Sequence, residues 1–218
     1  MPSQARFPAL LQVLIMPLLP AFRSMAIVAA LTTITSGALT AQSSGAAAGA
    51  QRPVSIWLGV SASTPVSDFK ELAKSGFAGQ GAVQFRPAGS VFGVRGELQY
   101  HKMDMTPESL SAAGASAGVT GSWSVLYGGV TAVMESMPAR AGLGWYVLAG
   151  GGTYRVEPSV SDGGVSASIA KTKLGFNGGG GIRVRMGAIA AFVEARYHTV
   201  TIEDSKVTLL PVSLGLVF

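Results

Sequence analysis

Apolar side chains occupy every second position of the last nine residues of the chain, which ends on an aromatic residue. Residues two apart on a β-strand point to the same face, so this alternation produces one continuous apolar row. The row consists of Leu210, Val212, Leu214, Leu216 and Phe218. The pattern predicts a strand at the end of the chain, with one face that is suited to lipid.

The charge content supports a lipid-exposed surface. Charged residues make up 12% of the chain, whereas about 25% is usual for soluble domains. The net charge is +5, and it falls to +3 without the first 41 residues, which hold two arginines and no acidic residue. This small excess does not indicate nucleic-acid binding. The chain has no cysteine, which excludes thiol chemistry and cysteine metal sites.

The first 41 residues have the three regions of a secretory signal. Arg6 and Arg23 supply positive charge, an apolar run covers 25–35, and small residues follow up to Ala41. We therefore expect residues 1–41 to be a signal peptide that is cleaved after Ala41.

The apolar run is shorter than the ~20 residues that a membrane helix needs. Residues 7–22 are also apolar, however, so an N-terminal anchor helix is the alternative. A start at Met16 instead of Met1 would give a more ordinary signal length. Residues 42–53 are rich in Ser, Ala and Gly, and we expect them to form a flexible periplasmic leader.

Residues 54–218 alternate with the period of a β-strand in about eight segments. The expected strands cover residues 54–63, 78–86, 92–101, 117–134, 145–155, 173–185, 191–198 and 210–218. The connections alternate between long and short. The long ones are expected at 64–77, 102–116 and 157–172, with a further loop at 203–206.

No segment after the signal region offers a helical span of eighteen apolar residues, so a closed barrel is the available way to cross a bilayer. An even strand number, long external loops and short periplasmic turns are typical of outer-membrane barrels. The chain is therefore predicted to be all-β, an eight-stranded antiparallel up-and-down transmembrane β-barrel over residues 54–218. Both ends of the barrel are expected on the periplasmic side.

Two strands are harder to orient. Gly128 and Gly129 are interpreted as a β-bulge at which the strand over 117–134 changes phase. The strand over 145–155 has apolar or glycine residues on both faces, so its orientation stays open. Among the aromatic residues, Trp57 is expected inside the barrel, whereas Tyr100 and Tyr197 are expected at the membrane interfaces.

The polar rows of the strands combine many glycines and serines with a few large charged residues. A soluble barrel would show the same period with its apolar row inside, but its outer face would carry abundant Lys and Glu. A charged residue on a lipid face costs roughly 2–4 kcal/mol near the midplane. The sequence therefore predicts a lumen charge network in which the groups neutralise one another, formed by Arg95, Glu97, Arg183, Arg185, Glu194 and Arg196.

Both histidines, His101 and His198, fall at the outer ends of inward rows. A Ser or Thr activated by His198, with Glu194 as its orienting group, would be the enzymatic interpretation. Residues four apart on a strand lie ~13 Å apart, which is too far for a direct hydrogen bond. We therefore predict no enzyme, no catalytic or metal-binding residue and no cofactor, and we interpret the histidines as satisfied or solvated.

Three segments carry a resemblance to a known family. The closing strand that ends in Phe218, the strand that contains 194–198, and the Gly-rich strand from Phe176 resemble the outer-membrane β-barrel family of OmpA-type and OmpX-type proteins. The resemblance spans residues 54–218. It implies a Gram-negative outer-membrane location, no cofactor, and Phe218 as part of the signal that the barrel-assembly machinery reads. No peptidoglycan-binding module follows Phe218, so we expect no cell-wall tether.

The leading hypothesis is a small outer-membrane barrel with a structural or surface-interaction role in the cell envelope, a plugged charged lumen and no open pore. Its expected partners are outer-membrane lipid, lipopolysaccharide and, through the last strand, the assembly machinery. We expect a monomer that does not bind nucleic acid. The alternatives are a lipid A-modifying enzyme, a narrow channel, and a soluble periplasmic lipocalin-like binder.

Overall fold

The computed structural model describes residues 53–112, 114–116, 118–136, 142–162, 165–202 and 205–218. The expected signal peptide, its cleavage site and all of the expected leader except Pro53 lie outside these residues.

Most of the described residues belong to β-strands. The strands are β1 (Val54–Pro65), β2 (Gly76–Phe85), β3 (Phe92–Asp104), β4 (Thr120–Glu135), β5 (Leu143–Asp162), β6 (Val165–Ser168), β7 (Lys171–Met186), β8 (Ile189–Ile202) and β9 (Ser205–Val217). A 3-10 helix, η2 (Ser67–Glu71), follows β1, and a short α-helix, α2 (Pro107–Ala112), follows β3. Within the described residues, neither helix is long and apolar enough to cross a membrane.

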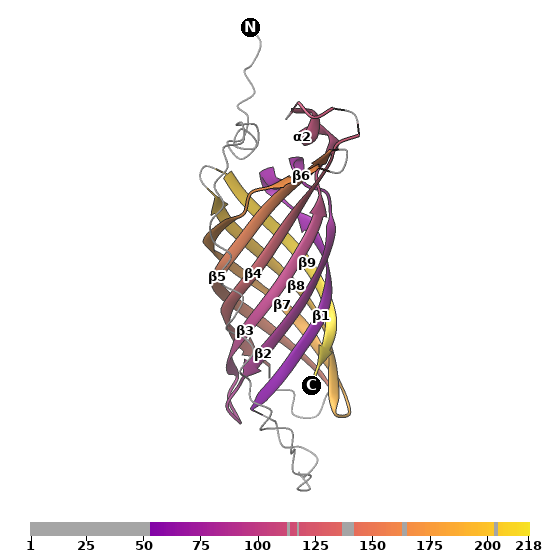
Figure 1. Ribbon diagram of the computed structural model, residues 1–218. Coiled ribbons are helices and arrows are strands. Elements are labelled where there is room, and N and C mark those ends of the chain that lie inside the picture. Colours follow the sequence, from indigo (N-terminus) through magenta and orange to yellow (C-terminus); the bar gives the residue numbers. More distant parts are fainter. Residues whose placement is uncertain (1–52, 113, 117, 137–141, 163–164, 203–204) are drawn as a thin grey trace, which may run out of the picture.

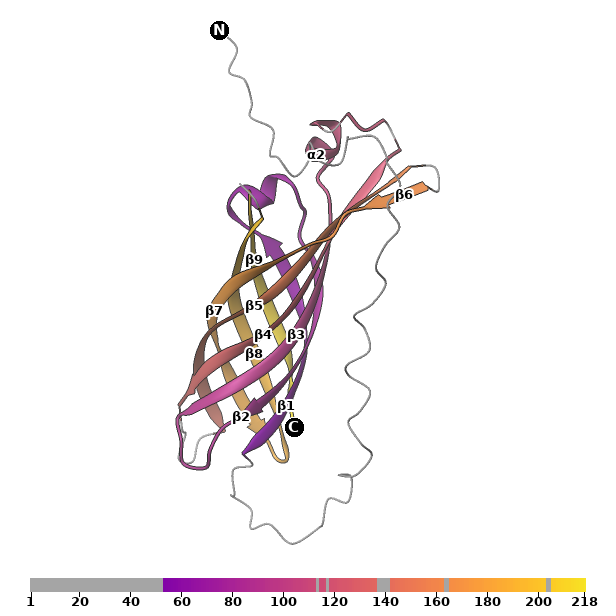
Figure 2. The same ribbon diagram turned by 60° about the vertical axis from the view of Figure 1, so that its left-hand side comes forward.

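Eight of the strands form a closed antiparallel barrel (Figures 1 and 2). The order around the wall is β1, β2, β3, β4, β5, β7, β8 and β9, and β9 pairs with β1 to close the ring. In the closing pair, Trp57 is opposite Val217 and Ser63 is opposite Pro211. Closure leaves no unpaired strand edge in the wall. The predicted eight-stranded antiparallel barrel is confirmed.

The connections from β1 to β2 and from β3 to β4 lie at one end of the barrel, together with β6. The expected loop at 203–206, at the same end, is shorter than predicted, because β8 ends at Ile202 and β9 already begins at Ser205. Helix α2 and strand β6 lie at the upper end in Figure 1, whereas β1 begins and the chain finishes at the lower end. The turn between β7 and β8 contains only residues 187–188. Both ends of the barrel segment therefore lie on the short-turn side, as the alternating connections predict.

The expected long loop at 157–172 is mostly strand, so that prediction is wrong. Strand β5 continues to Asp162 and then pairs with β6, with Ser159 opposite Ser168 and Asp162 opposite Val165. The two strands form a ribbon that rises beyond the barrel wall (Figure 2). The physical reason is that β4 keeps pairing with β5 as far as Ser161, which extends the sheet outward.

The predicted bulge at Gly128 and Gly129 is also wrong. The register of β4 with β3 and β5 runs through both glycines without a break. The odd-numbered side chains of β4 point into the lumen on both sides of the glycine pair, from Trp123 to Glu135. Gly129 is required for another reason: a Cβ atom there would overlap the hydroxyl of Tyr127. The glycine makes space for an aromatic side chain inside the barrel.

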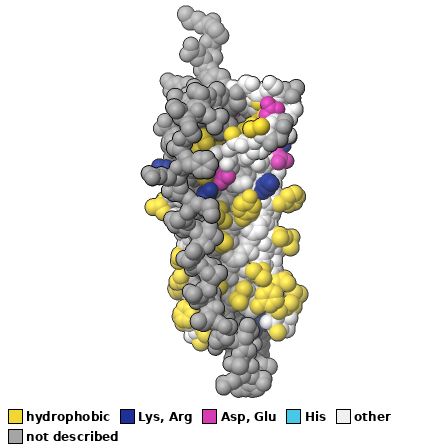
Figure 3. Space-filling model, in the orientation of Figure 1, with side chains coloured by type: hydrophobic (Ala, Val, Ile, Leu, Met, Phe, Trp, Pro, Cys, Tyr) yellow, Lys and Arg dark blue, Asp and Glu magenta, His cyan; other side chains and the backbone are white. Residues whose placement is uncertain are grey.

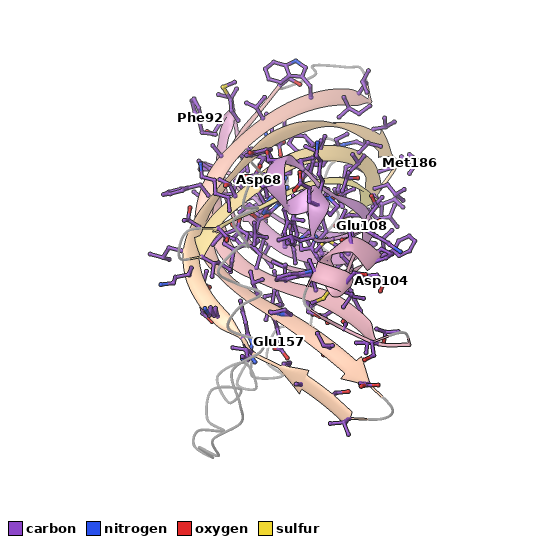
Figure 4. The ribbon with its side chains drawn as sticks, turned by 90° about the horizontal axis from the view of Figure 1, so that it is seen from above. Asp68, Phe92, Asp104, Glu108, Glu157 and Met186 are labelled. Carbon is purple, nitrogen blue, oxygen red and sulfur yellow. The ribbon has the colours of Figure 1, made fainter. Side chains whose placement is uncertain are left out.

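The outer face of the barrel is apolar and the inner face holds the core. The predicted outward rows of β1, β3 and β9 are exposed, including Val60, Phe92 and Leu214. On the visible face in Figure 3, apolar side chains spread over the lower part and most charged ones lie in the upper half. Strand β5, whose orientation was open, turns Tyr146, Leu148 and other even-numbered residues inward. Seen from above, side chains fill the ring of strands (Figure 4).

Candidate functional site

The middle of the lumen contains four charged side chains from two strands that face each other. The odd-numbered residues of β3 point into the lumen, and so do the even-numbered residues of β8. Arg95 and Glu97 on β3 therefore face Glu194 and Arg196 on β8. Arg95 Nη1 donates to Glu194 Oε2 at 2.8 Å. Arg196 donates to Glu194 Oε1 at 2.7 Å and to Glu97 Oε1 at 2.5 Å. Two positive and two negative groups balance one another within this network.

Neutral side chains satisfy the remaining hydrogen-bonding capacity of the network. Gln84 Oε1 accepts from Arg95 Nε at 3.0 Å and from Nη2 at 2.9 Å. Thr131 and Tyr127 both donate to Glu97 Oε1. The guanidinium of Arg95 also lies 3.8 Å from the ring centre of Trp57, a cation–π contact. Buried charges are costly unless they are paired in this way.

A second ionic cluster lies nearer the short-turn end of the lumen. Glu135 Oε2 is 3.1 Å from Arg183 Nη2 and 3.5 Å from Arg86 Nε, and Gln84 Nε2 donates to Glu135 Oε1 at 2.6 Å. Arg185, which the sequence predicts in the lumen charge network, is exposed, because it lies at the end of β7, one residue before the strand finishes.

Sequence reasoning missed Glu135 and Arg86 as lumen residues. The expected strand ended at residue 134, one residue before Glu135, and the expected bulge at Gly128 and Gly129 interrupted the alternation before that point. Uninterrupted alternation from Tyr127 would have placed Glu135 inside, since both positions are odd.

Above the ion network lies a layer that contains both histidines. Nδ1 of His101 lies 2.7 Å from Ser63 Oγ, and Nδ1 of His198 lies 2.8 Å from Tyr154 Oη. The two imidazole ring centres are 5.8 Å apart. His198 contacts Tyr154, whereas Glu194 bonds to the two arginines. The arrangement needed for the enzymatic interpretation, with Glu194 orienting His198, is therefore not assembled.

An apolar cluster fills the outer end of the lumen. Phe69 from η2 packs edge-on against Trp123, with ring centres 5.3 Å apart. Figure 4 shows the connection that carries Asp68 lying over the ring of strands. The cluster consists of Phe69, Ala73, Met103, Met105, Trp123, Val125, Tyr127, Tyr154, Val156, Val200, Ile202, Val207 and Leu209. Sequence reasoning missed this cluster, although apolar residues on the inward row at Trp123 and Val125 were a signal for it.

Comparison with known proteins supports the fold and does not identify a function. No protein-family model and no curated protein matches the chain. The structure is similar to that of Neisserial surface protein A, with a TM-score of 0.56 and 12% identity over 76% of this chain and 96% of that chain. It is also similar to a major outer membrane protein from Thermus thermophilus, with a TM-score of 0.50 and 13% identity over 77% of this chain and 99% of that chain. The predicted resemblance to small outer-membrane β-barrels is confirmed at the level of the fold.

Proposed function

We propose that this protein is a small outer-membrane β-barrel with a structural or surface-contact role in the cell envelope, a plugged lumen and no open pore. The observation that carries the proposal is the continuous apolar band around a closed barrel whose ionic groups are inside. The inverse arrangement would be needed for a soluble barrel that carries an apolar ligand.

The height of the apolar band fits a bilayer. The outward rows run from Phe77 to Phe85 on β2, from Phe92 to Tyr100 on β3, and from Leu210 to Phe218 on β9. Each row spans eight residue steps, which corresponds to ~26 Å along a strand. A strand tilt of ~40° reduces this to ~20 Å, close to the ~25 Å band of outer-membrane barrels.

The exposure of these rows is unfavourable in water. Phe77 is 81% exposed and Leu214 is 62% exposed, and both belong to rows with further large apolar residues. Contiguous apolar surface of this kind indicates contact with lipid or another apolar partner. Outer-membrane lipid and lipopolysaccharide are therefore the proposed partners of the outer wall.

Two features of the lumen support the absence of a pore. The four central charges bind one another, and the apolar cluster around Phe69 and Trp123 covers the outer end. An eight-stranded barrel has an interior that side chains just fill. A conducting path would have to separate the ion pairs and displace the apolar cluster.

The last strand is the proposed contact with the barrel-assembly machinery. Phe218 and Ile56 exchange backbone hydrogen bonds of 2.9 and 3.0 Å, which complete the closing pair. Phe218 also exposes about half of its side chain at the short-turn end. We propose a monomer, because the closed wall offers no strand edge for pairing with a second copy.

Membrane fractionation tests this proposal. The protein should be recovered with the outer membrane, and the folded form should migrate differently from the heated form on a detergent gel. Recovery as a monodisperse species in detergent-free buffer would contradict the proposal. A heat-insensitive band from the inner membrane would contradict it as well.

A further inference from the structure

Among the buried polar atoms that bind nothing in the described residues, three belong to the two histidines and to Asn177, and a fourth is Gln99 Oε1, two residues before His101 on β3. The first three are His101 Nε2, His198 Nε2 and Asn177 Oδ1, and their residues are at least nine-tenths buried. Asn177 on β7 is directly opposite His198 on β8, and His198 is next to His101 across the lumen. Buried polar atoms are nearly always bonded to protein, water or an ion, so the layer that contains the two histidines is expected to hold a water molecule or an ion.

The contacts of His198 involve its Nδ1 and leave its Nε2 free. Tyr154 Oη is 2.8 Å from His198 Nδ1 and 3.3 Å from the backbone carbonyl of Phe176, which accepts the hydroxyl proton when Nδ1 carries a proton of its own. A neutral imidazole that carries its proton on Nδ1 has a free electron pair on Nε2.

The orientation of Asn177 follows from the same kind of reasoning. The hydroxyl of Tyr127 donates to Glu97 Oε1 and accepts from Asn177 Nδ2 at 2.8 Å. The amide nitrogen of Asn177 is thereby occupied, and its Oδ1 is the free acceptor.

His101 is held in a similar way. Ser63 Oγ lies 2.7 Å from Nδ1 of His101, so Nε2 is the free nitrogen of this ring too. A hydrogen bond from the other ring nitrogen is the arrangement that usually orients a metal-binding histidine. Two imidazoles that share an ion through bonds of ~2.1 Å have ring centres about 5 to 6 Å apart, and the observed separation is 5.8 Å.

We propose that His101 Nε2, His198 Nε2 and Asn177 Oδ1 bind one divalent first-row transition-metal ion inside the barrel. Imidazole nitrogens and an amide oxygen suit such ions, and water completes their coordination. This set differs from centres with three or more His, Cys, Asp or Glu side chains, none of which occurs among the described residues.

The charged groups next to the layer are paired with one another. Arg196 is two residues before His198 on the same strand, and its guanidinium binds both Glu194 and Glu97. The apolar cluster lies above the layer and encloses the ion. The ion is therefore taken up while the barrel folds, and it exchanges slowly afterwards.

Copper binding tests the proposal. The full chain is folded in detergent with CuSO4, passed over a desalting column with a chelator, and examined by electron paramagnetic resonance. We expect one retained ion per chain, with splitting from two nitrogens. The chain contains only two histidines, so this pattern assigns the ligands.

Three variants give matched comparisons. His101→Leu and His198→Leu should each reduce the splitting to one nitrogen and weaken binding at least tenfold. Asn177→Ala should weaken binding and keep both nitrogens. Retention that is unchanged when both histidines are replaced, or wild-type protein that retains no copper because the layer binds only water, would overturn the proposal. If the variants do not fold, as judged by heat-dependent gel mobility, a wild-type spectrum without two-nitrogen splitting decides against it.

Discussion

Arg95 on β3 and Glu194 on β8 are separated by 99 residues in the sequence, yet their charged groups lie 2.8 Å apart in the centre of the barrel. Glu194 also accepts from Arg196, so one carboxylate joins two arginines. Because strands β3 and β8 are not neighbours in the wall, the ion pair links opposite sides of the barrel through its interior.

Replacing Arg95 should therefore destabilise the barrel. Arg95→Met leaves Glu194 with one cationic partner and removes the contact with Trp57. Breaking a buried ion pair costs about 3–5 kcal/mol. Urea unfolding of the protein in lipid vesicles, followed by tryptophan fluorescence, measures this change.

Arg185→Met is the matched control for Arg95→Met. Arg185 is exposed at the end of β7, so its replacement should change the free energy of unfolding by less than ~0.5 kcal/mol. Equal effects of the two substitutions would show that the central network does not stabilise the fold.

Two glycines in the neighbouring strands β3 and β4 should differ in how far they tolerate a larger side chain. Gly129 has no space for a Cβ because of Tyr127, whereas a Cβ at Gly96 meets no atom within 4 Å. Gly129→Val should cost at least ~1–3 kcal/mol through overpacking. Gly96→Val should be neutral or slightly stabilising, since valine favours strands. The free energies of unfolding of both variants test this difference. A Gly129→Val variant as stable as the wild type would contradict the uninterrupted register of β4.

The strands of the barrel and the faces of several of them could be predicted from the alternation of apolar and polar residues. Alternation with period two sets which residues of a strand share a face, so the outward rows of β1, β3 and β9 could be read directly. The glycine-rich strands could not be oriented in the same way. In β4 the pair Gly128 and Gly129 resembles a bulge, and only pairing with β3 and β5 shows that the phase continues.

The contacts inside the lumen could not be predicted from this alternation, because they join residues from strands that are far apart in the sequence. The partners of Arg95 and Arg196 depend on the register and curvature of the closed wall, which bring β3 and β8 together across the lumen. The position of Phe69 depends on how a connection folds back over the barrel mouth, and this is a tertiary interaction. Burial of Ser63 beside His101 likewise requires strands that are 38 residues apart to meet.

Removing Phe69 should weaken the outer plug without opening a pore. Phe69→Ala deletes a fully buried ring that packs on Trp123, and such deletions cost about 3–5 kcal/mol. The central ion pairs still occupy the lumen below the plug. Planar bilayers with either wild-type or variant protein should therefore show no resolved conductance steps. Clear steps in the wild type would contradict the proposed plugged lumen, and steps in the variant alone would assign closure to the apolar plug.

Two exposed apolar residues distinguish a lipid-facing surface from a water-facing one. Leu214 on β9 is 62% exposed within the apolar band, and Val165 on β6 is 76% exposed on the ribbon beyond the barrel wall. Leu214→Arg places a charge in the hydrocarbon region and should cost about 2–4 kcal/mol. Val165→Arg remains in water and should change stability by less than ~0.5 kcal/mol. Unfolding in vesicles measures both values. If Leu214→Arg were as neutral as Val165→Arg, water rather than lipid would contact the wall, and the membrane assignment would be wrong.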